Sequence, residues 1–303
     1  MLADAGGLLW VDIEAADGRA EGEPLLRDVF GFHPLTIDDC YNTLVDPPKV
    51  DDYGDYLFMI VHHAQLEDQA SRLTTSELDL YVGANYVVSL HKQAISAVAE
   101  LMRRAENHER LMSHGPAFLA HALFDVIVDD FHPVVEALDD RVDAAQETVL
   151  ERPEQDVLQE VLALKRMGLR LKRTILPQRD VANRFARGEY GRLVPPEALF
   201  YFRDVYDHTV RLEEMIDNVR DLSDSALNTY LSSVNNRTNE VMKTLAIVTV
   251  VFLPLTLLAS VYGTNFHEVW PHYSWDGGFA TMIAAFVVIS GSLVAWFRWR
   301  RWI

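Results

Sequence analysis

The feature that most constrains this chain is a pair of long uncharged runs near its C-terminal end. No charged residue lies between Lys243 and His267, and a second uncharged run extends from Gly277 to Phe297. The first run has 23 residues, enough at about 1.5 Å of helical rise per residue to cross a hydrocarbon layer of about 30 Å. We therefore predict two membrane-spanning helices, 244–266 and 277–297, joined by the loop 267–276.

Basic residues flank the two predicted spans on one side only. Arg237 and Lys243 precede the first span, the basic tail 298–303 with its three arginines follows the second, and the loop 267–276 has no Lys or Arg. Positively charged flanks stay in the cytoplasm. We therefore expect a multi-pass protein of the cell (inner) membrane, with both termini cytoplasmic and the loop external.

The charge of the rest of the chain is strongly negative. Residues 237–303 hold five Lys or Arg and three acids, so the total net charge of −18 leaves −20 on residues 1–236. Such a surface repels nucleic acid and attracts cations, although an acidic surface kept only for solubility is an equally simple interpretation. The single cysteine, Cys40, suits a reducing compartment, and the N-terminal residues do not resemble a signal peptide.

Strand signals are confined to a predicted α/β domain, 1–92. Residues 8–13 favour a short strand, and 56–66 and 78–92 favour paired strands around a Gly-Ala-Asn turn. Residues 24–32 favour a helix ending at Gly31. A second helix is predicted to begin with Thr36 as its N-cap and Asp39 at the third helical position.

Helical periodicity follows in a predicted hairpin region, 93–195, and a stalk helix, 196–243, that enters the first span. Residues 116–190 resemble a long helical hairpin that turns near 151–154. Its outgoing arm is acidic and its returning arm is basic, with Lys165, Lys172 and Arg179 among the cations. We expect the two arms to pair, rather than the basic arm to bind nucleic acid, because the surrounding domain is so acidic.

One face of the stalk and first span carries residues that are small or polar at most positions. At 100° per residue a single band, drifting by about 20° per heptad, collects Asn228, Asn235, Asn239, Met242, Ala246, Thr249, Leu253, Thr256, Ser260 and Gly263. Such a stripe favours helices that pack around a common axis. From the periodicity alone, close helix packing is a better explanation than a pore.

Several motifs are similar to those of one transporter family. The segments 236–243 (NRTNEVMK), 252–256 (FLPLT) and 262–266 (YGTNF) resemble the signature of the CorA family of divalent-cation transporters, and similarity continues through 201–208, 176–181, 49–58 and 32–40. Gly263-Thr264-Asn265 stands where the family has Gly-Met-Asn. The resemblance implies an α+β cytosolic domain, a long stalk helix and two C-terminal transmembrane helices, assembled in the lipid bilayer as a funnel-shaped homopentamer with a central pore.

The resemblance also assigns the pore. The implied pore and selectivity residues are Gly263, Thr264, Asn265, Thr256, Leu253, Thr249, Leu245, Met242, Asn239 and Asn228. Because Mg²⁺ loses its water reluctantly, neutral oxygen acceptors are suited to contact its hydration shell. Apolar constrictions along the same face suit gating by dewetting. Without the resemblance, Gly263 to Asn265 are equally consistent with a left-handed turn that closes a helix.

A regulatory cation site is implied as well. The resemblance pairs Asp39 of one protomer with Asp204 of its neighbour, and it suggests Asp38, Asp125 and His208 for a second site. A cation between converging carboxylates would replace repulsion by a bridge. The alternatives are that Asp39 only caps a helix and that Asp204 and His208 form an ordinary i,i+4 pair.

The leading hypothesis is therefore a channel-like transporter of Mg²⁺, with Co²⁺ or Ni²⁺ as further ions, gated by cytosolic Mg²⁺. A zinc transporter similar to ZntB is the alternative that Thr264 raises, although the predicted pore face has no His or Cys for Zn²⁺. A membrane-anchored scaffold that conducts nothing is the alternative of another class. We do not expect an enzyme, since the sequence has no phosphate loop, nucleophile elbow or HExxH motif.

Overall fold

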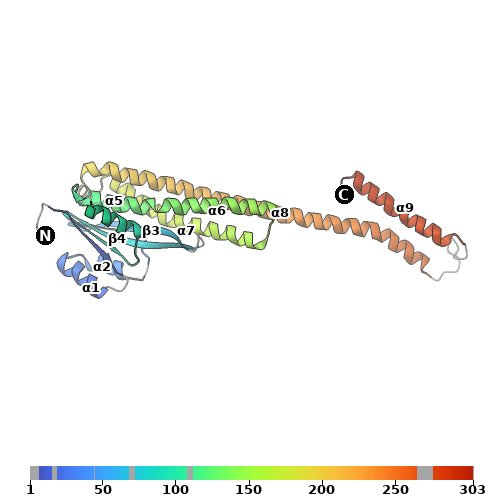
Figure 1. The fold of residues 1–303 in the computed structure, drawn as a ribbon, viewed down its shortest axis with the longest axis horizontal. Helices are drawn as coiled ribbons and strands as arrows, with labels where there is room; N and C mark the ends of the chain where they lie inside the picture. The colour runs from blue at the N-terminus through green and yellow to red at the C-terminus, as the bar shows by residue number, and fades with distance from the viewer. Residues whose placement is uncertain are drawn as a thin grey trace. The chain divides into compact units, whose positions relative to one another are not determined.

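The computed structural model of the protein describes residues 7–15, 19–43, 45–67, 72–107, 112–264 and 276–302. They form two units, Met1–Thr229 and Tyr230–Ile303 (Figure 1). Helix α8, Leu199–Tyr262, contributes its N-terminal half to the first unit and its C-terminal half to the second.

A five-stranded sheet organises the first unit. Its strands are β1 (Leu9–Glu14), β2 (Lys49–Asp52), β3 (Tyr56–Glu67), β4 (Arg72–Gly83) and β5 (Tyr86–His91), in the spatial order β1-β5-β4-β3-β2. Strand β1 runs parallel to β5, and the other neighbours are antiparallel. The predicted strands are confirmed, and β4 and β5 pair around the Gly-Ala-Asn turn. Strand β2 was not predicted.

Helices cover both faces of this sheet. Helix α1 (Arg19–Pro24), the π-helical turn η1 (Leu25–Val29) and α2 (Pro34–Tyr41) supply a small core on one face, in which Phe32 stacks on Tyr81 at 3.9 Å between ring centroids. The predicted helix 24–32 corresponds to the end of α1 and η1, and the chain leaves it at Gly31 with a φ of 71°. Burial on both faces explains why the first half of β3 is a continuous apolar run, Leu57 to Val61.

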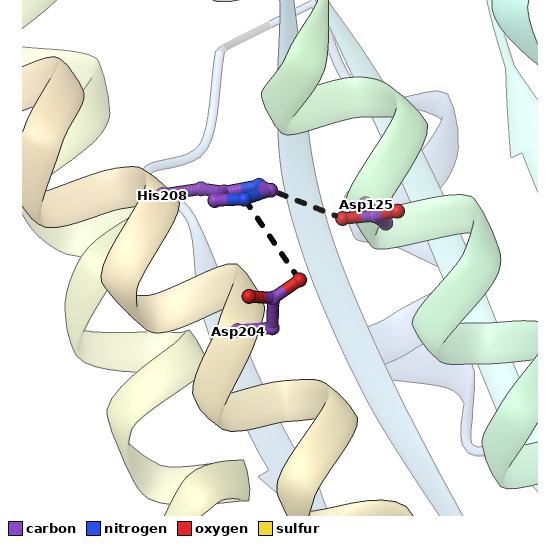
Figure 2. Close-up of side chains that lie close together, drawn as sticks. All are labelled: Asp125, Asp204 and His208. Carbon is purple, nitrogen blue, oxygen red and sulfur yellow. Dashed lines mark ion pairs between the residues drawn. The ribbon is translucent and has the colours of Figure 1, made fainter.

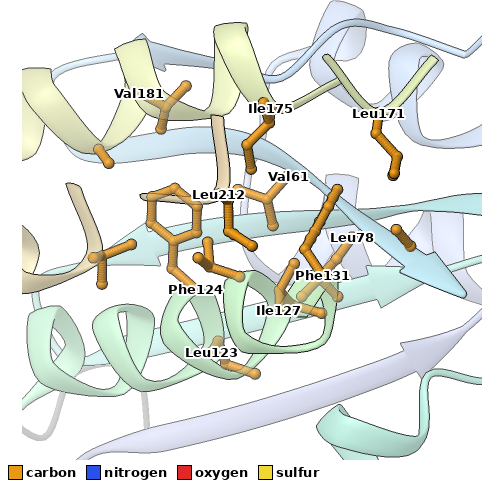
Figure 3. Close-up of a cluster of buried hydrophobic side chains, with 14 of the residues drawn as sticks. Val61, Leu78, Leu123, Phe124, Ile127, Phe131, Leu171, Ile175, Val181 and Leu212 are labelled. Atoms are coloured by element: carbon orange, nitrogen blue, oxygen red, sulfur yellow. The ribbon is translucent and has the colours of Figure 1, made fainter. Parts of the chain in front are cut away.

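The larger core lies on the other face. It is built by α3 (Ser96–Asn107), α5 (Pro116–Asp129), α6 (Phe131–Glu151), α7 (Gln155–Ala186), the 3₁₀ turn η2 (Pro196–Ala198) and the N-terminal half of α8. Figure 3 shows Phe124 and Ile127 of α5 meeting Val61 of β3 and Leu212 of α8. Each such fully buried side chain stabilises the fold by roughly 1.5–3 kcal/mol. This packing ties α8 to the sheet.

The helical hairpin is confirmed, but its charges pair differently from the prediction. The turn between α6 and α7 lies at Arg152 to Glu154. Between the arms, the described residues show one ion pair, Arg141–Glu160 at 3.1 Å. The basic residues of α7 instead pair with α8, through Lys165–Asp224 at 2.5 Å, Lys172–Asp217 at 2.6 Å and Arg179–Glu213 at 2.6 Å.

The physical reason is the heptad spacing of these cations. Lys165, Lys172 and Arg179 lie seven residues apart and so share one face of α7. That face is turned toward α8, where Asp217 and Asp224 have the same spacing. The prediction that the arms pair with each other was wrong, because α7 contacts two helices and its basic stripe faces the other one.

The start of α2 also differs from the prediction. His33, not Thr36, is the N-cap, since its Nδ1 accepts a hydrogen bond from the Leu35 amide at 3.2 Å. Pro34 occupies the first helical turn, where its fixed φ is favourable. The Thr36 hydroxyl donates to the His33 carbonyl at 2.9 Å. Asp39 therefore lies in the last turn of α2 and has no capping role.

In the second unit, the C-terminal half of α8 continues through Pro254 to Tyr262, and α9 covers Gly278–Trp299. Both helices are long and apolar enough to cross a membrane, as the sequence predicted. Helix α8 ends four residues before the predicted boundary of the first span. Asn265 and the remainder of the connecting loop up to residue 275 lie outside the described residues.

Candidate functional site

Two groups of functional candidates can be located on the described residues. The first is the stripe on α8, and the second is a set of titratable side chains in the Met1–Thr229 unit. Asn228 belongs to the latter unit, whereas the other stripe residues lie in the Tyr230–Ile303 unit.

The stripe residues are exposed in the single chain. The stripe residues Met242 and Leu253 are among the more exposed large apolar side chains, at 59% and 64%, and so is Leu245, which the resemblance adds to the pore, at 58%. Thr249 and Thr256 each donate their hydroxyl hydrogen to the carbonyl four residues earlier, at 2.8 Å in both cases. The hydroxyl oxygens therefore keep their lone pairs, so this face of the helix offers acceptors next to apolar side chains.

The end of α8 is tightly closed. The Gly263 amide donates to the Ala259 carbonyl at 2.9 Å, and the Thr264 hydroxyl donates to the Val261 carbonyl at 2.6 Å. A Cβ on residue 263 would lie 3.2 Å from the Ala259 oxygen, which is closer than an ordinary contact. Gly263 does not have the left-handed φ that a turn of that kind requires. Close approach of backbone explains this glycine better than a left-handed cap does.

The second group forms a cluster between α5 and α8. Asp125 of α5 and Asp204 and His208 of α8 bring their ligand atoms within 4.8 Å of one another (Figure 2). The His208 Nδ1 lies 3.8 Å from Asp125 and 3.5 Å from Asp129, and its Nε2 lies 3.8 Å from Asp204. The helical spacing that places Asp204 beside His208 is i,i+4, as in the ordinary pair considered above.

Electrostatics in this cluster favour a cation. Burial raises the pKa of the Asp125 carboxyl, and the Asp129 and Asp204 carboxylates add to that rise while His208 opposes it. Carboxylates that repel in this way are stabilised by any positive charge brought among them. The two carboxylates suit Mg²⁺ that keeps several of its waters, and the imidazole beside them suits Co²⁺ or Ni²⁺.

The two acids of α2 lie elsewhere in the single chain. Asp38 pairs with Arg19 at 3.2 Å, and Asp39 pairs with Lys49 of β2 at 2.7 Å. Three of the five proposed regulatory residues, Asp125, Asp204 and His208, are therefore brought together within one chain, and Asp38 and Asp39 are not part of that cluster.

Two residues near these acids were missed by the sequence reasoning. Asp129 lies one helical turn after Asp125, so the i,i+4 spacing on α5 was the signal that could have found it. Lys49 is the first residue of β2, the strand that was not predicted. Its pairing with Asp39 depends on how β2 is aligned with β3. No local pattern in the sequence indicates that contact.

Comparisons with known proteins agree over nearly the whole chain. The family model described as CorA-like Mg²⁺ transporter protein matches residues 5–301. The cobalt/magnesium transport protein CorA of Thermotoga maritima is 33% identical over 302 residues, which cover 99% of this chain and 85% of the relative.

A solved structure and a more distant relative complete the comparison. The complete structure of the CorA magnesium transporter from Methanocaldococcus jannaschii matches with a TM-score of 0.86 and 23% identity, covering 97% of this chain and 91% of that one. At this identity the likeness is one of fold. The zinc transport protein ZntB of Cronobacter sakazakii is 24% identical over 233 residues, covering 74% of this chain and 67% of the relative.

Proposed function

Because the chain belongs to the family of CorA-like Mg²⁺ transporter proteins, we propose that it carries Mg²⁺, and also Co²⁺ or Ni²⁺, across the cell membrane through a central pore. The observation that carries this proposal is the match of the family model to residues 5–301, which includes both apolar helices and the acidic first unit. Five copies of the chain form the pore in this proposal, with the α8 stripes facing the common axis.

The pore would handle the ion with most of its water attached. Stripping Mg²⁺ is costly, so a ring of neutral oxygen acceptors that contacts the water shell can select the ion and still release it. Asn265 and the Gly263 backbone would supply such acceptors at the outer mouth, followed by the Thr256 and Thr249 hydroxyls and the Asn239 amide. The free lone pairs of Thr249 and Thr256 support this role. Thr264 and Asn228 would complete the two ends of this path.

Apolar rings would close the same path. Met242, Leu245 and Leu253 are exposed on the single chain, and their copies would meet around the axis. A ring of apolar side chains excludes water when it narrows, so a small change in diameter stops a hydrated ion. The proposal therefore separates selectivity at the mouth from gating along the stalk.

Regulation is assigned to the first unit. Asp39 of one copy and Asp204 of the next would hold a cytosolic Mg²⁺ between them, and Asp38, Asp125 and His208 would contribute a second site. The cluster of Asp125, Asp204 and His208 supports the second assignment, since its donor set fits a divalent cation. A cation that binds the closed assembly better than the open one stabilises closure. Loss of cytosolic Mg²⁺ would then favour opening.

The orientation of the chain follows from the same membrane argument. The arginines at the end of α9 and the basic residues before the first span favour a cytoplasmic position for both termini, so the proposed regulatory unit would sample the cytosolic ion concentration. The mouth formed by residues 263–265 then faces outside. This arrangement suits uptake under negative feedback.

The test is ion flux into proteoliposomes that contain the full-length protein. Asn265→Ala is expected to abolish Mg²⁺ influx, because it removes the amide acceptor of the mouth, and Asn236→Ala is the matched control, since Asn236 lies off the stripe. Zn²⁺ flux without Mg²⁺ flux would indicate that the protein transports zinc, as the ZntB alternative predicts. Absence of flux for every ion, from a folded oligomer, would support a scaffold instead.

A further inference from the structure

The C-terminal end of α9 has an unusual turn. The Arg301 amide donates to the Arg298 carbonyl at 3.1 Å, and the Trp302 amide donates to the Phe297 carbonyl at 2.9 Å. These two bonds form a Schellman motif, in which the residue after the C-cap adopts a left-handed backbone. That residue is Arg301, with a φ of 57°, and among the described residues it is the one non-glycine with a positive φ.

An arginine is a poor choice for this position on conformational grounds. Glycine or asparagine normally occupies it, because a Cβ is disfavoured in the left-handed region. The rest of the motif is well formed, since the Trp302 ring stacks on the buried Phe297 ring at 5.7 Å between centroids. A disfavoured residue in an otherwise regular turn indicates that its side chain serves a function.

The neighbouring side chains hold a second guanidinium in place. The Arg300 Cζ lies 5.8 Å from the centroid of the Trp296 ring and 5.5 Å from that of Trp299. Contact with an aromatic face uses the plane of a guanidinium and leaves its in-plane N–H groups available. The Trp299 side chain is 76% exposed, so this arrangement lies on the surface of the helix end.

Among residues 276–302 and the rest of the described chain, no carboxylate pairs with Arg298, Arg300 or Arg301. The carbonyls of Trp296, Phe297 and Arg298 all accept backbone hydrogen bonds, so the helix end presents few free acceptors of its own. The turn therefore offers guanidinium donors and exposed indole rings directly after an apolar span.

We propose that the turn Trp296–Trp302 binds the head group of an anionic phospholipid, with the guanidinium groups of Arg298, Arg300 and Arg301 donating to its phosphodiester and the indole rings lying against its glycerol and upper acyl region. Guanidinium forks match phosphate oxygens bidentately. Indole rings favour the level of the head groups. Continuity with the apolar helix argues for a lipid rather than a soluble anion or an acidic protein surface.

Charge alone would also favour the cytoplasmic side of a membrane, so the test must separate a built site from a diffuse one. Full-length protein is placed in nanodiscs of equal phosphatidylcholine and phosphatidylglycerol, and native mass spectrometry measures the ratio of the two lipids retained after extraction. Wild type is expected to retain phosphatidylglycerol preferentially. Arg300→Gln and Arg301→Gly are each expected to lower that ratio about fivefold.

Arg301→Gly is the decisive variant, because glycine is the residue that the turn prefers. Loss of lipid from that variant cannot be attributed to a damaged turn. The double variant Arg300→Lys, Arg301→Lys keeps the charge and removes the fork, so it is expected to lose most of the preference. Arg237→Gln removes one positive charge from the same unit and is expected to leave the ratio unchanged.

Each contrary outcome would overturn the proposal. An unchanged ratio in Arg301→Gly would mean that the Arg301 side chain does not contact the lipid. An unchanged ratio in the double lysine variant would mean that charge alone attracts the lipid. An equal loss in Arg237→Gln would mean that the interaction is spread over the unit. Displacement of the retained lipid by added inorganic phosphate would identify a site for a free anion. A ratio of the two lipids near one in wild type would mean that the arginines bind an acidic protein partner instead of a lipid.

Discussion

Asp79 of β4 is a carboxyl group whose environment opposes its ionisation. Its side chain is on the α2 face of the sheet and is 2% exposed, and its Oδ1 has no hydrogen-bond partner. Burial raises the pKa of Asp79 to about 7. The Glu77 and Asp39 carboxylates add to that rise, whereas Cys40 and Lys92 oppose it. Cys40 is a residue of α2, so Asp79 lies directly beneath the helix that carries Asp38 and Asp39.

The sign of the effect follows from the two pKa values of Asp79. Between the ordinary value of 3.8 and about 7, the folded state holds a proton that the unfolded chain has released. Stability therefore falls as the pH rises, by about 1.4 kcal/mol per pH unit, and the full cost above pH 7 is about 4 kcal/mol. Asp79→Asn is neutral at every pH and removes this dependence.

The variant has a second, constant effect. A buried amide that finds too few acceptors costs about 1–3 kcal/mol, but this cost does not change with pH. The stability of Asp79→Asn relative to wild type should thus rise by about 3 kcal/mol from pH 5 to pH 8, whatever the offset. The equilibrium constant for opening of this region, compared between variant and wild type, should therefore change by about a hundredfold over this pH range.

Hydrogen–deuterium exchange of the full-length protein measures this ratio locally. Peptides from β4 and α2 are compared between variant and wild type at each pH, so the intrinsic pH dependence of exchange cancels. Asp55→Asn is the control, because the Asp55 side chain is 91% exposed and pairs with Arg192 on the surface. A protection ratio for Asp79→Asn that stays flat from pH 5 to pH 8 would refute the reasoning.

Two further predictions concern regulation and the core. Lys49→Met removes the ammonium group 2.7 Å from the Asp39 carboxylate, so internal Mg²⁺ should inhibit flux at a concentration lower by about fivefold, as measured in proteoliposomes. Phe124→Ala leaves a cavity at a fully buried position between α5, β3 and α8, and it should cost about 3–5 kcal/mol in the thermal or denaturant unfolding of the first unit, whereas the partly exposed Phe118→Ala should cost less.

The sequence predicted those parts of the fold that a local signal encodes. The long apolar runs required two membrane-spanning helices, and the β-branched and aromatic runs gave β3, β4 and β5. Strand β2 was not predicted because Lys49–Asp52 contains two acids and no alternation of polar and apolar residues. It becomes a strand only through its pairing with β3. On β3, past the point where β2 ends, the His62 amide donates a hydrogen bond to the Gln178 side chain of α7 at 2.8 Å. The two residues are 116 positions apart in the sequence, so no local pattern reveals this contact.

The candidate site was predictable where helical spacing determines it. Asp204 and His208 follow from an i,i+4 interval, but their convergence with Asp125 depends on how α5 packs against α8. The cap of α2 shows the opposite case, in which two local signals competed. Thr36 and Asp39 have the spacing of a capping box, yet His33 and Pro34 begin the helix one turn earlier.

The carboxylates that we propose for regulation already have basic partners or a neighbouring histidine within one chain, and this constrains how a cation could act on them. Arg19 neutralises Asp38, Lys49 neutralises Asp39, and His208 lies 3.8 Å from Asp204. In the proposed site, a divalent cation between copies would compete with these basic groups for the carboxylates, so its affinity would be set by the difference between the two interactions. Lys49→Met should therefore strengthen inhibition by Mg²⁺, and Asp39→Asn should weaken it. If the Asp39–Lys49 pair only stabilised the fold, both substitutions would act in the same direction, because each breaks the same ion pair.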